Sequence, residues 1–200
     1  MMDRIDETDP FKVVAMIPTF ETPRLILRPT RLEDADATQA LFPHWEIVRF
    51  LSDRVPWPYP ADGAHTYYRD VALPAMEAGN LWSWTIWLKG GPDHHIGSVE
   101  LRDLNGDNRG FWLGLPWHGR GIMTEACEPV TDYWFNTLGR ETLRVAKAPD
   151  NTASRRVTEK QGARVIAIEE RSYVGGVCAA EIWELTREDW NALRAATRSV

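Results

Sequence analysis

Apolar positions in the first 115 residues of the chain group into four extended segments and two helical ones. Branched and aromatic residues predict strands at 24–28, 81–88, 95–101 and 110–115. Helices are predicted to begin at Thr30 or Arg31 and again near Asp62, because the prolines of 56–60 exclude regular structure between them. The second helix is expected to end near Gly79, and the three strands after it predict an antiparallel meander.

The hydrophobic period changes after Pro116, where apolar residues recur every four positions. The residues that share this helical face are Ile122, Ala126, Val130, Trp134 and Leu138. Gly139 can end this helix. Pro129 lies inside it and predicts a local kink, because proline cannot donate the ladder hydrogen bond.

Shorter segments complete the chain, with a strand at 143–146, a helix at 152–161, and strands at 164–173 and 179–185. The resulting order is β-α-α-β-β-β-α-β-α-β-β. It predicts an α/β or α+β domain around a single mixed, mostly antiparallel sheet of about seven strands flanked by helices. Residues 1–21 carry little periodicity, so we expect an N-terminal arm followed by one domain at 22–200.

Composition narrows the classes of function. The 200 residues include 29 acidic and 23 basic side chains, and the net charge of -6 removes the usual electrostatic attraction to nucleic acid or anionic membranes. Cys127 and Cys178 are too few for a disulfide framework and lack metal-ligand spacing, and His94 and His95 point to opposite faces of a strand. We therefore predict no metal site, no secretory signal and no membrane helix, and expect a cytoplasmic protein.

The segment 110–126 carries the clearest chemical signal. Its sequence, GFWLGLPWHGRGIMTEA, places a Gly119-Arg120-Gly121 loop between a strand and the start of a helix. Glycines let the backbone approach a ligand closely, and the first N–H groups of a helix have no partner within it. With the helix dipole, these features predict an anion site suited to a diphosphate, with Arg120 and His118 as further contacts. The structural alternative is a turn that simply needs two glycines.

Two familiar phosphate loops do not fit this segment. A P-loop needs Lys followed by Ser or Thr after the second glycine, where this chain has Ile122 and Met123. The dinucleotide fingerprint needs a third glycine where Thr124 stands, and a leading βαβ unit. The loop therefore belongs to neither class of nucleotide site.

Several motifs in combination resemble those of the GNAT superfamily of N-acetyltransferases. The resemblance covers residues 22–185 and includes TPRLILRPTRLEDADA, VPWPYPADGAHTYY, IGSVELRDL, GFWLGLPWHGRGIMTEA and PDNTASRRVTEKQGA, in the family's order. It points to the branch typified by ribosomal-protein N-terminal (alanine/serine) acetyltransferases. The resemblance implies the acyl-CoA N-acyltransferase fold, with splayed central strands and acetyl-CoA as the acetyl donor.

The resemblance also implies which residues bind acetyl-CoA. The strand at 110–115 would splay from the strand at 143–146, and backbone groups of Leu113 and Leu115 would bind the pantetheine arm. Pro116 replaces the Gln or Arg of the family's loop, which removes a side-chain contact and leaves the backbone cradle. The pyrophosphate would be bound by the amides of Trp117, His118, Gly119, Arg120, Gly121, Ile122 and Met123.

Asn151 and Ser154 match the N-x-x-S signature of this branch. In the family, the Asn contacts the cofactor arm and the Ser lies near the thioester sulfur. Capping of the helix at 152–161 is the alternative role for both. Many family members use a Tyr to protonate the departing thiolate, but Thr158 occupies that position, so Ser154 acting through water is the substitute acid.

Glu100 is the candidate general base, because strand alternation places it opposite its apolar neighbours and toward the expected cleft. A solvent-facing or salt-bridged carboxylate is the alternative. Glu170, on a later strand, is a further candidate, and Trp57, beside prolines, would line the acceptor pocket. An amine that arrives deprotonated would need no base.

The sequence thus predicts an acetyl-CoA-dependent N-acetyltransferase that acetylates a primary amine, either a protein N-terminus or a small molecule, by direct attack on the thioester. A backbone N–H near Leu113 or Leu115 would polarise the carbonyl. The alternative is a non-catalytic acyl-CoA-binding regulatory module, because the usual Tyr is absent. A homodimer through the C-terminal strands is a family inference, and no nucleic acid or membrane partner is expected.

Overall fold

The computed structural model describes residues 17–104 and 106–198, so most of the predicted arm at 1–21 lies outside the described residues. The strands are β1 (Phe20–Glu21), β2 (Leu25–Pro29), β3 (Leu81–Leu88), β4 (Gly97–Arg102), β5 (Arg109–Leu113), β6 (Thr142–Lys147), β7 (Arg164–Tyr173) and β8 (Gly176–Thr186). The α-helices are α1 (Ala35–Leu41), α2 (Trp45–Val48), α3 (Gly63–Tyr67), α4 (Leu73–Glu77), α5 (Ile122–Asp132), α6 (Thr152–Lys160) and α7 (Arg187–Arg198). Shorter segments are 3-10 turns at Leu32–Asp34 and Leu115–Trp117 and π-helical turns at Tyr68–Ala72 and Tyr133–Thr137.

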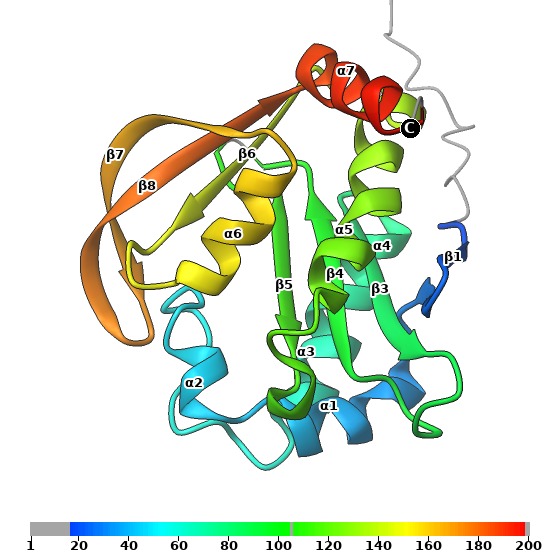
Figure 1. Ribbon diagram of the computed structural model, residues 1–200. Helices are drawn as coiled ribbons and strands as arrows, with labels where there is room; N and C mark the ends of the chain where they lie inside the picture. The colour runs from blue at the N-terminus through cyan, green and yellow to red at the C-terminus, as the bar shows by residue number, and fades with distance from the viewer. Residues whose placement is uncertain (1–16, 105, 199–200) are drawn as a thin grey trace, which may run out of the picture.

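The strands form two hydrogen-bonded sheets (Figure 1). Five strands pair in the order β1-β2-β3-β4-β5 and three in the order β6-β8-β7, and every pair is antiparallel. The predicted α+β architecture with mostly antiparallel strands is confirmed. The single sheet is instead interrupted between β5 and β6, which form no strand ladder in the part of the chain that the structure describes.

Asn108, just before β5, joins the two sheets. Its backbone N–H donates to the carbonyl oxygen of Arg144 at 2.7 Å, and its Oδ1 accepts from the Arg144 N–H at 2.9 Å. Beyond this joint β5 and β6 run in the same direction and diverge (Figure 1). The predicted splay of the two strands is therefore present, and it leaves backbone groups at both strand edges that need partners.

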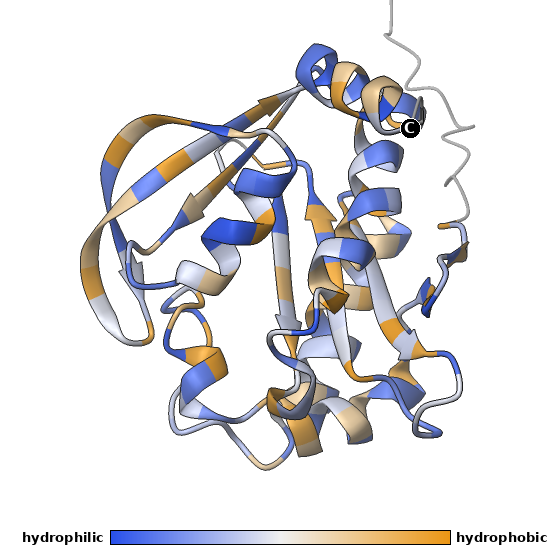
Figure 2. Ribbon diagram, in the orientation of Figure 1, coloured by the Kyte–Doolittle hydropathy of each residue, from blue (hydrophilic) through white to orange (hydrophobic). Residues whose placement is uncertain are grey.

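Helices cover both faces of the five-stranded sheet. Strand alternation sends Trp82, Trp84 and Ile86 toward the core under α5, and sends Leu81 into a second apolar cluster with α1, α3 and the π-helical turn before α4. Most of the α6 surface is polar by contrast (Figure 2). The space between the diverging strands β5 and β6, called the gap below, lies beside this packed core. Close packing of the core can keep both strand edges rigid.

The central helix has the predicted apolar face. Ile122, Ala126, Val130 and Trp134 are all buried against the sheet. Pro129 has no N–H to donate, and the π-helical turn begins four residues later, at Tyr133. The C-terminal helix α7 was not predicted; its Trp190 completes the same core.

Candidate active site

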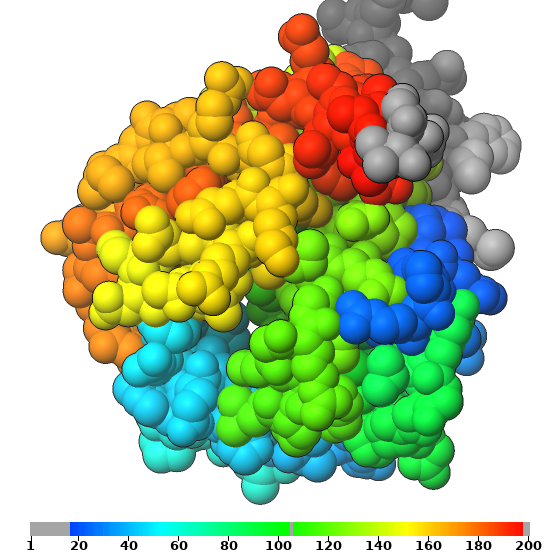
Figure 3. Space-filling model, in the orientation of Figure 1, coloured from blue at the N-terminus to red at the C-terminus, as the bar shows by residue number. Residues whose placement is uncertain are grey.

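The loop before α5 has the geometry of an anion site. Gly119 and Gly121 have φ angles of 74° and 72°, in the left-handed region that glycine adopts without strain. Gly121 is the N-cap of α5 and makes no side-chain cap. A Cβ added to Gly119 would meet no described atom within 4 Å, so the loop borders open space. Figure 3 shows a hollow where α6 faces the segment that leads into α5.

The N–H groups at the start of α5 are available to a ligand. Those from Gly119 to Thr124 make no hydrogen bond to any described residue. The amides of Trp117 and His118 are already engaged, because they donate to the carbonyl oxygens of Gly114 at 3.0 Å and Leu115 at 3.2 Å. The free amides therefore begin at Gly119, two residues later than the range predicted from sequence.

The loop is tied to the N-terminal part of the sheet through Glu125. Its carboxylate accepts from the Thr22 hydroxyl at 2.6 Å, the Arg24 N–H at 2.9 Å and the Arg24 Nε at 2.6 Å. Partial burial acts to raise the pKa of Glu125, but these donors outweigh it and hold the pKa below its usual value. Arg24 Nη1 also donates to the Arg120 carbonyl oxygen at 3.0 Å, so Arg24 contacts both the loop backbone and the first turn of α5.

The edge of β5 directs alternate backbone groups into the gap. Gly110 pairs with Glu100 across the β4–β5 ladder, and the Gly114 N–H donates to Ile96, so the even-numbered residues bond toward β4. The N–H and C=O groups of Phe111 and Leu113 therefore face β6. His118 Nε2 lies 2.7 Å from the Leu113 carbonyl oxygen, so this predicted phosphate contact is directed toward the strand.

Leu115 does not lie on that edge. The strand predicted at 110–115 ends at Leu113, and Leu115 begins a 3-10 turn with Pro116 at its second position. Proline has a fixed φ and no N–H, which suits the start of such a turn and not a paired strand. Leu115 instead packs with Phe42, Ile47 and Val48 on the opposite face of the sheet.

Helix α6 borders the gap with the two residues of the N-x-x-S signature. The Asn151 Oδ1 accepts from the Ser154 N–H at 3.2 Å, which confirms the capping role of Asn151. Ser154 is buried, and its hydroxyl makes no hydrogen bond to a described residue. The Thr158 hydroxyl donates to the Ser154 carbonyl oxygen at 3.2 Å, so Thr158 is used within the helix.

Glu100 is held by a charged partner and a phenol. Its Oε1 pairs with Arg102 Nη2, its Oε2 accepts from the Tyr67 hydroxyl at 3.3 Å, and its side chain is 16% exposed. Burial, assisted by the Glu100 charge, raises the pKa of Tyr67 to about 12, so this phenol remains a donor at neutral pH. The salt-bridged carboxylate expected as the alternative for Glu100 is therefore confirmed.

Two residues predicted on the acceptor side are exposed. Trp57 is 42% exposed and packs against Trp45, with ring centroids 5.6 Å apart. Glu170 is exposed on β7, opposite Ala179 of β8, and forms no ion pair within the described ranges. No hydrogen bond or ion pair between described residues joins either of them to the loop before α5.

Two buried cations near the joined end of the gap were not predicted. Arg109 is 2% exposed, and its Nη1 donates to Thr131 Oγ1 and Gln161 Oε1, both at 2.7 Å. Lys147, the last residue of β6, is 7% exposed, and its Nζ lies 4.8 Å from the Phe111 ring centroid. Burial lowers the pKa of Lys147 to about 8. Strand alternation puts Lys147 on the same buried face of β6 as Leu143 and Val145, and this alternation in the sequence could have identified the lysine.

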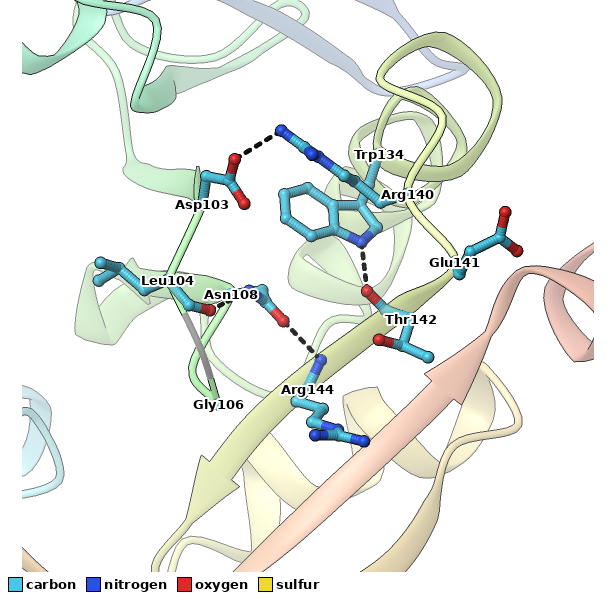
Figure 4. Close-up of a pocket in the computed structure, with 9 residues that line it drawn as sticks. All are labelled: Asp103, Leu104, Gly106, Asn108, Trp134, Arg140, Glu141, Thr142 and Arg144. Carbon is cyan, nitrogen blue, oxygen red and sulfur yellow. Dashed lines mark hydrogen bonds and ion pairs between the residues drawn. The ribbon is translucent and has the colours of Figure 1, made fainter.

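A polar cavity of about 170 Å³ lies at the joined end of the two sheets (Figure 4). It contains the joint between Asn108 and Arg144 and an ion pair of 2.5 Å between Arg140 and Asp103. Its lining shares no residue with the loop before α5, so it is a separate feature.

No group of three or more His, Cys, Asp or Glu side chains in residues 17–104 and 106–198 could hold a metal ion. None of the helices in those ranges combines the length and apolar character needed to cross a membrane.

Comparisons with known proteins agree with this geometry. The family described as acetyltransferase (GNAT) domain matches residues 24–164. A Bacillus subtilis relative, YdaF, whose name provisionally assigns it as a ribosomal N-acetyltransferase, is 30% identical over 109 residues. That match covers 48% of this chain and 55% of the relative, so the aligned region spans about half the length of YdaF.

Solved structures share the fold at low sequence identity. The ribosomal-protein-S5-alanine acetyltransferase from Vibrio fischeri is 16% identical with a TM-score of 0.73, and the match covers 86% of this chain and 98% of that one. RimJ of Mycobacterium smegmatis, in complex with CoA-disulfide, is 20% identical with a TM-score of 0.71, and the match covers 87% and 90% of the two chains.

Proposed function

The chain belongs to the GNAT family of acetyltransferases, and we propose that it transfers the acetyl group of acetyl-CoA to the α-amino group of a protein or peptide. It is an N-acetyltransferase of a family that uses acyl-CoA. Membership of this family favours a transferase over the non-catalytic acyl-CoA-binding module.

The observation that carries the proposal is the row of free amides from Gly119 to Thr124. Two glycines with positive φ bend this backbone, and open space borders it at Gly119. A diphosphate fits such a site, because unpaired N–H groups and the positive end of a helix dipole both favour an anion. We place the pyrophosphate of acetyl-CoA there and its pantetheine arm along Phe111 and Leu113.

The residues named here would then have distinct tasks. When bound, acetyl-CoA would supply an acetyl group activated as a thioester. The Leu113 N–H faces the gap and would donate to the thioester carbonyl oxygen as charge develops on it. Ser154 would lie beside the sulfur, with its hydroxyl free to donate, and Glu100 would accept a proton from the incoming amine.

The contacts of Glu100 with Arg102 and Tyr67 limit how it could accept a proton from the amine. Its charge is shared with Arg102 and its second oxygen binds Tyr67, so it can act on the amine only through the remaining lone pairs or a water. An N-terminal amine has an ordinary pKa near ~8, and a fraction of it is neutral without help at neutral pH. We therefore assign Glu100 to orienting the amine as well as to accepting its proton.

A protein N-terminus is the acceptor that the comparisons favour. Names among the similar proteins refer to ribosomal-protein acetyltransferases. Trp57 and Trp45 present an exposed aromatic surface that would contact the first side chains of a peptide. The net charge of -6 favours a basic acceptor over an acidic one.

Two measurements test the proposal. Titration calorimetry with coenzyme A should register binding, and thiol release from acetyl-CoA should be faster with peptides that carry a free N-terminus than with small amines. The same peptides with blocked N-termini are the control, because they keep every contact except the nucleophile. Binding of coenzyme A with turnover only on small amines would reject the peptide acceptor, and no binding would reject the site.

The homodimer stays a prediction. β7 is the edge of the three-stranded sheet, and it carries the exposed apolar residues Ile166 and Ile168. An edge strand of this kind can pair with a second copy. Sedimentation of the wild-type chain beside an Ile168→Lys variant would test the pairing, which should weaken in the variant.

A further inference from the structure

Lys147 is a buried lysine that forms no ion pair with any described residue. It is 7% exposed, and within the described ranges no carboxylate lies at ion-pair distance from its Nζ and no acceptor at hydrogen-bond distance. Its described contact is with the Phe111 ring, 4.8 Å from Nζ to the centroid. A buried ammonium that makes no ion pair or hydrogen bond destabilises a fold, and an apolar side chain at this position would pack better. The position therefore points to a role other than stability.

The position of Lys147 follows from the joint between the sheets. Asn108 and Arg144 bond the two strands together, and Phe111 and Lys147 each lie three residues beyond that joint. They therefore face one another across the start of the gap. Lys147 shares the inner face of β6 with Val145, which is buried in the core under α5. Nζ thus lies at the inner end of the gap, on the side that α5 and α6 cover.

Charged and titratable groups from each neighbouring element surround this ammonium. Arg109 of β5 and Cys127 of α5 interact with it, as does Asp107 before β5. Glu181 of β8 lies directly across the ladder and is paired with Arg155 of α6 at 2.8 Å. Burial lowers the pKa of Lys147 to about 8, which leaves the ammonium predominant at neutral pH and able to release its proton.

We propose that Lys147 lies beside the sulfur of the bound thioester and protonates the thiolate that leaves. This inference rests on the proposed function, because the pantetheine arm would enter the gap from the loop at Gly119 and run along Leu113 toward Phe111, which Lys147 faces. In the step, the amine nitrogen bonds to the acetyl carbon, and the carbon–sulfur bond breaks with its electron pair on sulfur. The proton of Lys147 moves to that sulfur, the proton lost by the amine passes to Glu100, and water carries a proton from Glu100 back to Lys147.

This assignment supplies the acid that the usual family position lacks. Thr158 is held within α6 and is not acidic at neutral pH, and the Ser154 hydroxyl is a weak acid. An ammonium with a pKa about 8 is matched to a thiol, whose ordinary pKa is near ~8.5. The same positive charge would favour the thiolate over the thiol before any proton moves.

The test measures the sulfur and needs no acceptor. Coenzyme A is mixed with excess protein, and its alkylation by iodoacetamide is followed against pH by mass spectrometry of the alkylated cofactor. We expect Lys147→Met to raise the midpoint of alkylation by at least one pH unit, which means about tenfold less thiolate at pH 7. Lys160→Met, which removes an exposed lysine from α6, is the matched control and should leave the midpoint unchanged.

The outcomes separate this inference from the proposed function. Equal midpoints in wild type and Lys147→Met, with coenzyme A bound by both, would overturn the role of Lys147 and leave the phosphate site intact. Failure of the wild type to bind coenzyme A would overturn both. Lys147→Met should melt at or above the wild-type temperature, because it replaces a buried charge by an apolar chain of similar length. A variant that unfolds would assign Lys147 a structural role instead.

Discussion

Replacing Gly119 by Asp tests the phosphate site most directly. The φ of 74° at Gly119 means that any side chain costs about 1–2 kcal/mol of backbone strain. No described atom lies within 4 Å of the added Cβ, so the variant can fold without a clash. The new carboxylate would then face the same open space as the pyrophosphate.

The electrostatic cost can be bounded from that geometry. Two unit charges about 4 Å apart repel by roughly 1 kcal/mol in water and roughly 4 kcal/mol at a protein surface. This range corresponds to an affinity loss between about fivefold and a thousandfold, and we expect at least tenfold for coenzyme A by calorimetry. Because salt screens exposed charges, the difference from wild type should shrink as ionic strength rises.

Two controls separate charge from strain. Gly119→Ala introduces the strain without the charge, and its Kd should stay within about threefold of wild type while its melting temperature falls by a few degrees. Gly90→Asp places the same carboxylate on a glycine with a φ of 69° and no described atom within 4 Å, in the turn after β3. Wild-type affinity in a folded Gly119→Asp variant would refute the placement of the phosphate site.

Three further predictions concern the acceptor side and stability. Glu100→Gln should lower kcat about tenfold or more and leave the Kd for coenzyme A unchanged, and an unchanged kcat would remove Glu100 from the chemistry. Trp57→Ala should raise the acceptor KM several-fold without affecting the KM for acetyl-CoA, and a constant acceptor KM would count against the aromatic wall. Burial, with the charges of His94 and Arg28, lowers the pKa of His95 to about 4. The ordinary pKa of histidine is about 6.5, so on acidification the unfolded chain binds a proton before the folded one. About 3 kcal/mol of the free energy of unfolding, fully present above pH 6.5, should therefore be lost as the pH falls to about 4. Chemical denaturation between pH 6.5 and 4 should show that the free energy of unfolding of His95→Gln falls less steeply with pH than that of the wild type. Identical pH dependence in the two proteins would contradict the lowered pKa of His95.

Local patterns identified most of the elements correctly. The strands predicted at 81–88 and 164–173 match β3 and β7, and the four-residue period of α5 matches its buried face. These features depend on side chains that repeat with the period of a strand or helix, so neighbours in sequence suffice to predict them. The C-terminal helix was missed even though Trp190 completes the core.

Some features of the candidate site were likewise predictable from the sequence, and others were not. The Gly119–Gly121 turn and the capping role of Asn151 were read from adjacent residues, because glycine conformation and helix capping are local. The extension of the strand to Leu115 was wrong, since the strand ends two residues earlier, at Leu113, and Leu115 and Pro116 begin a 3-10 turn. The ion pair that holds Glu100 and the engaged amides of Trp117 and His118 also depend on bonds that only the folded chain forms.

The sequence by itself determined the α+β class, the family and the glycine turn before α5, because each is written in contiguous residues. Only the tertiary structure decided that the strands separate into two sheets joined at Asn108, and that Lys147 is buried across the gap from Phe111. The separation into two sheets depends on which strand edges pair, and the burial of Lys147 depends on which residues then surround it. Both result from contacts between residues far apart in the chain, which no local sequence pattern records.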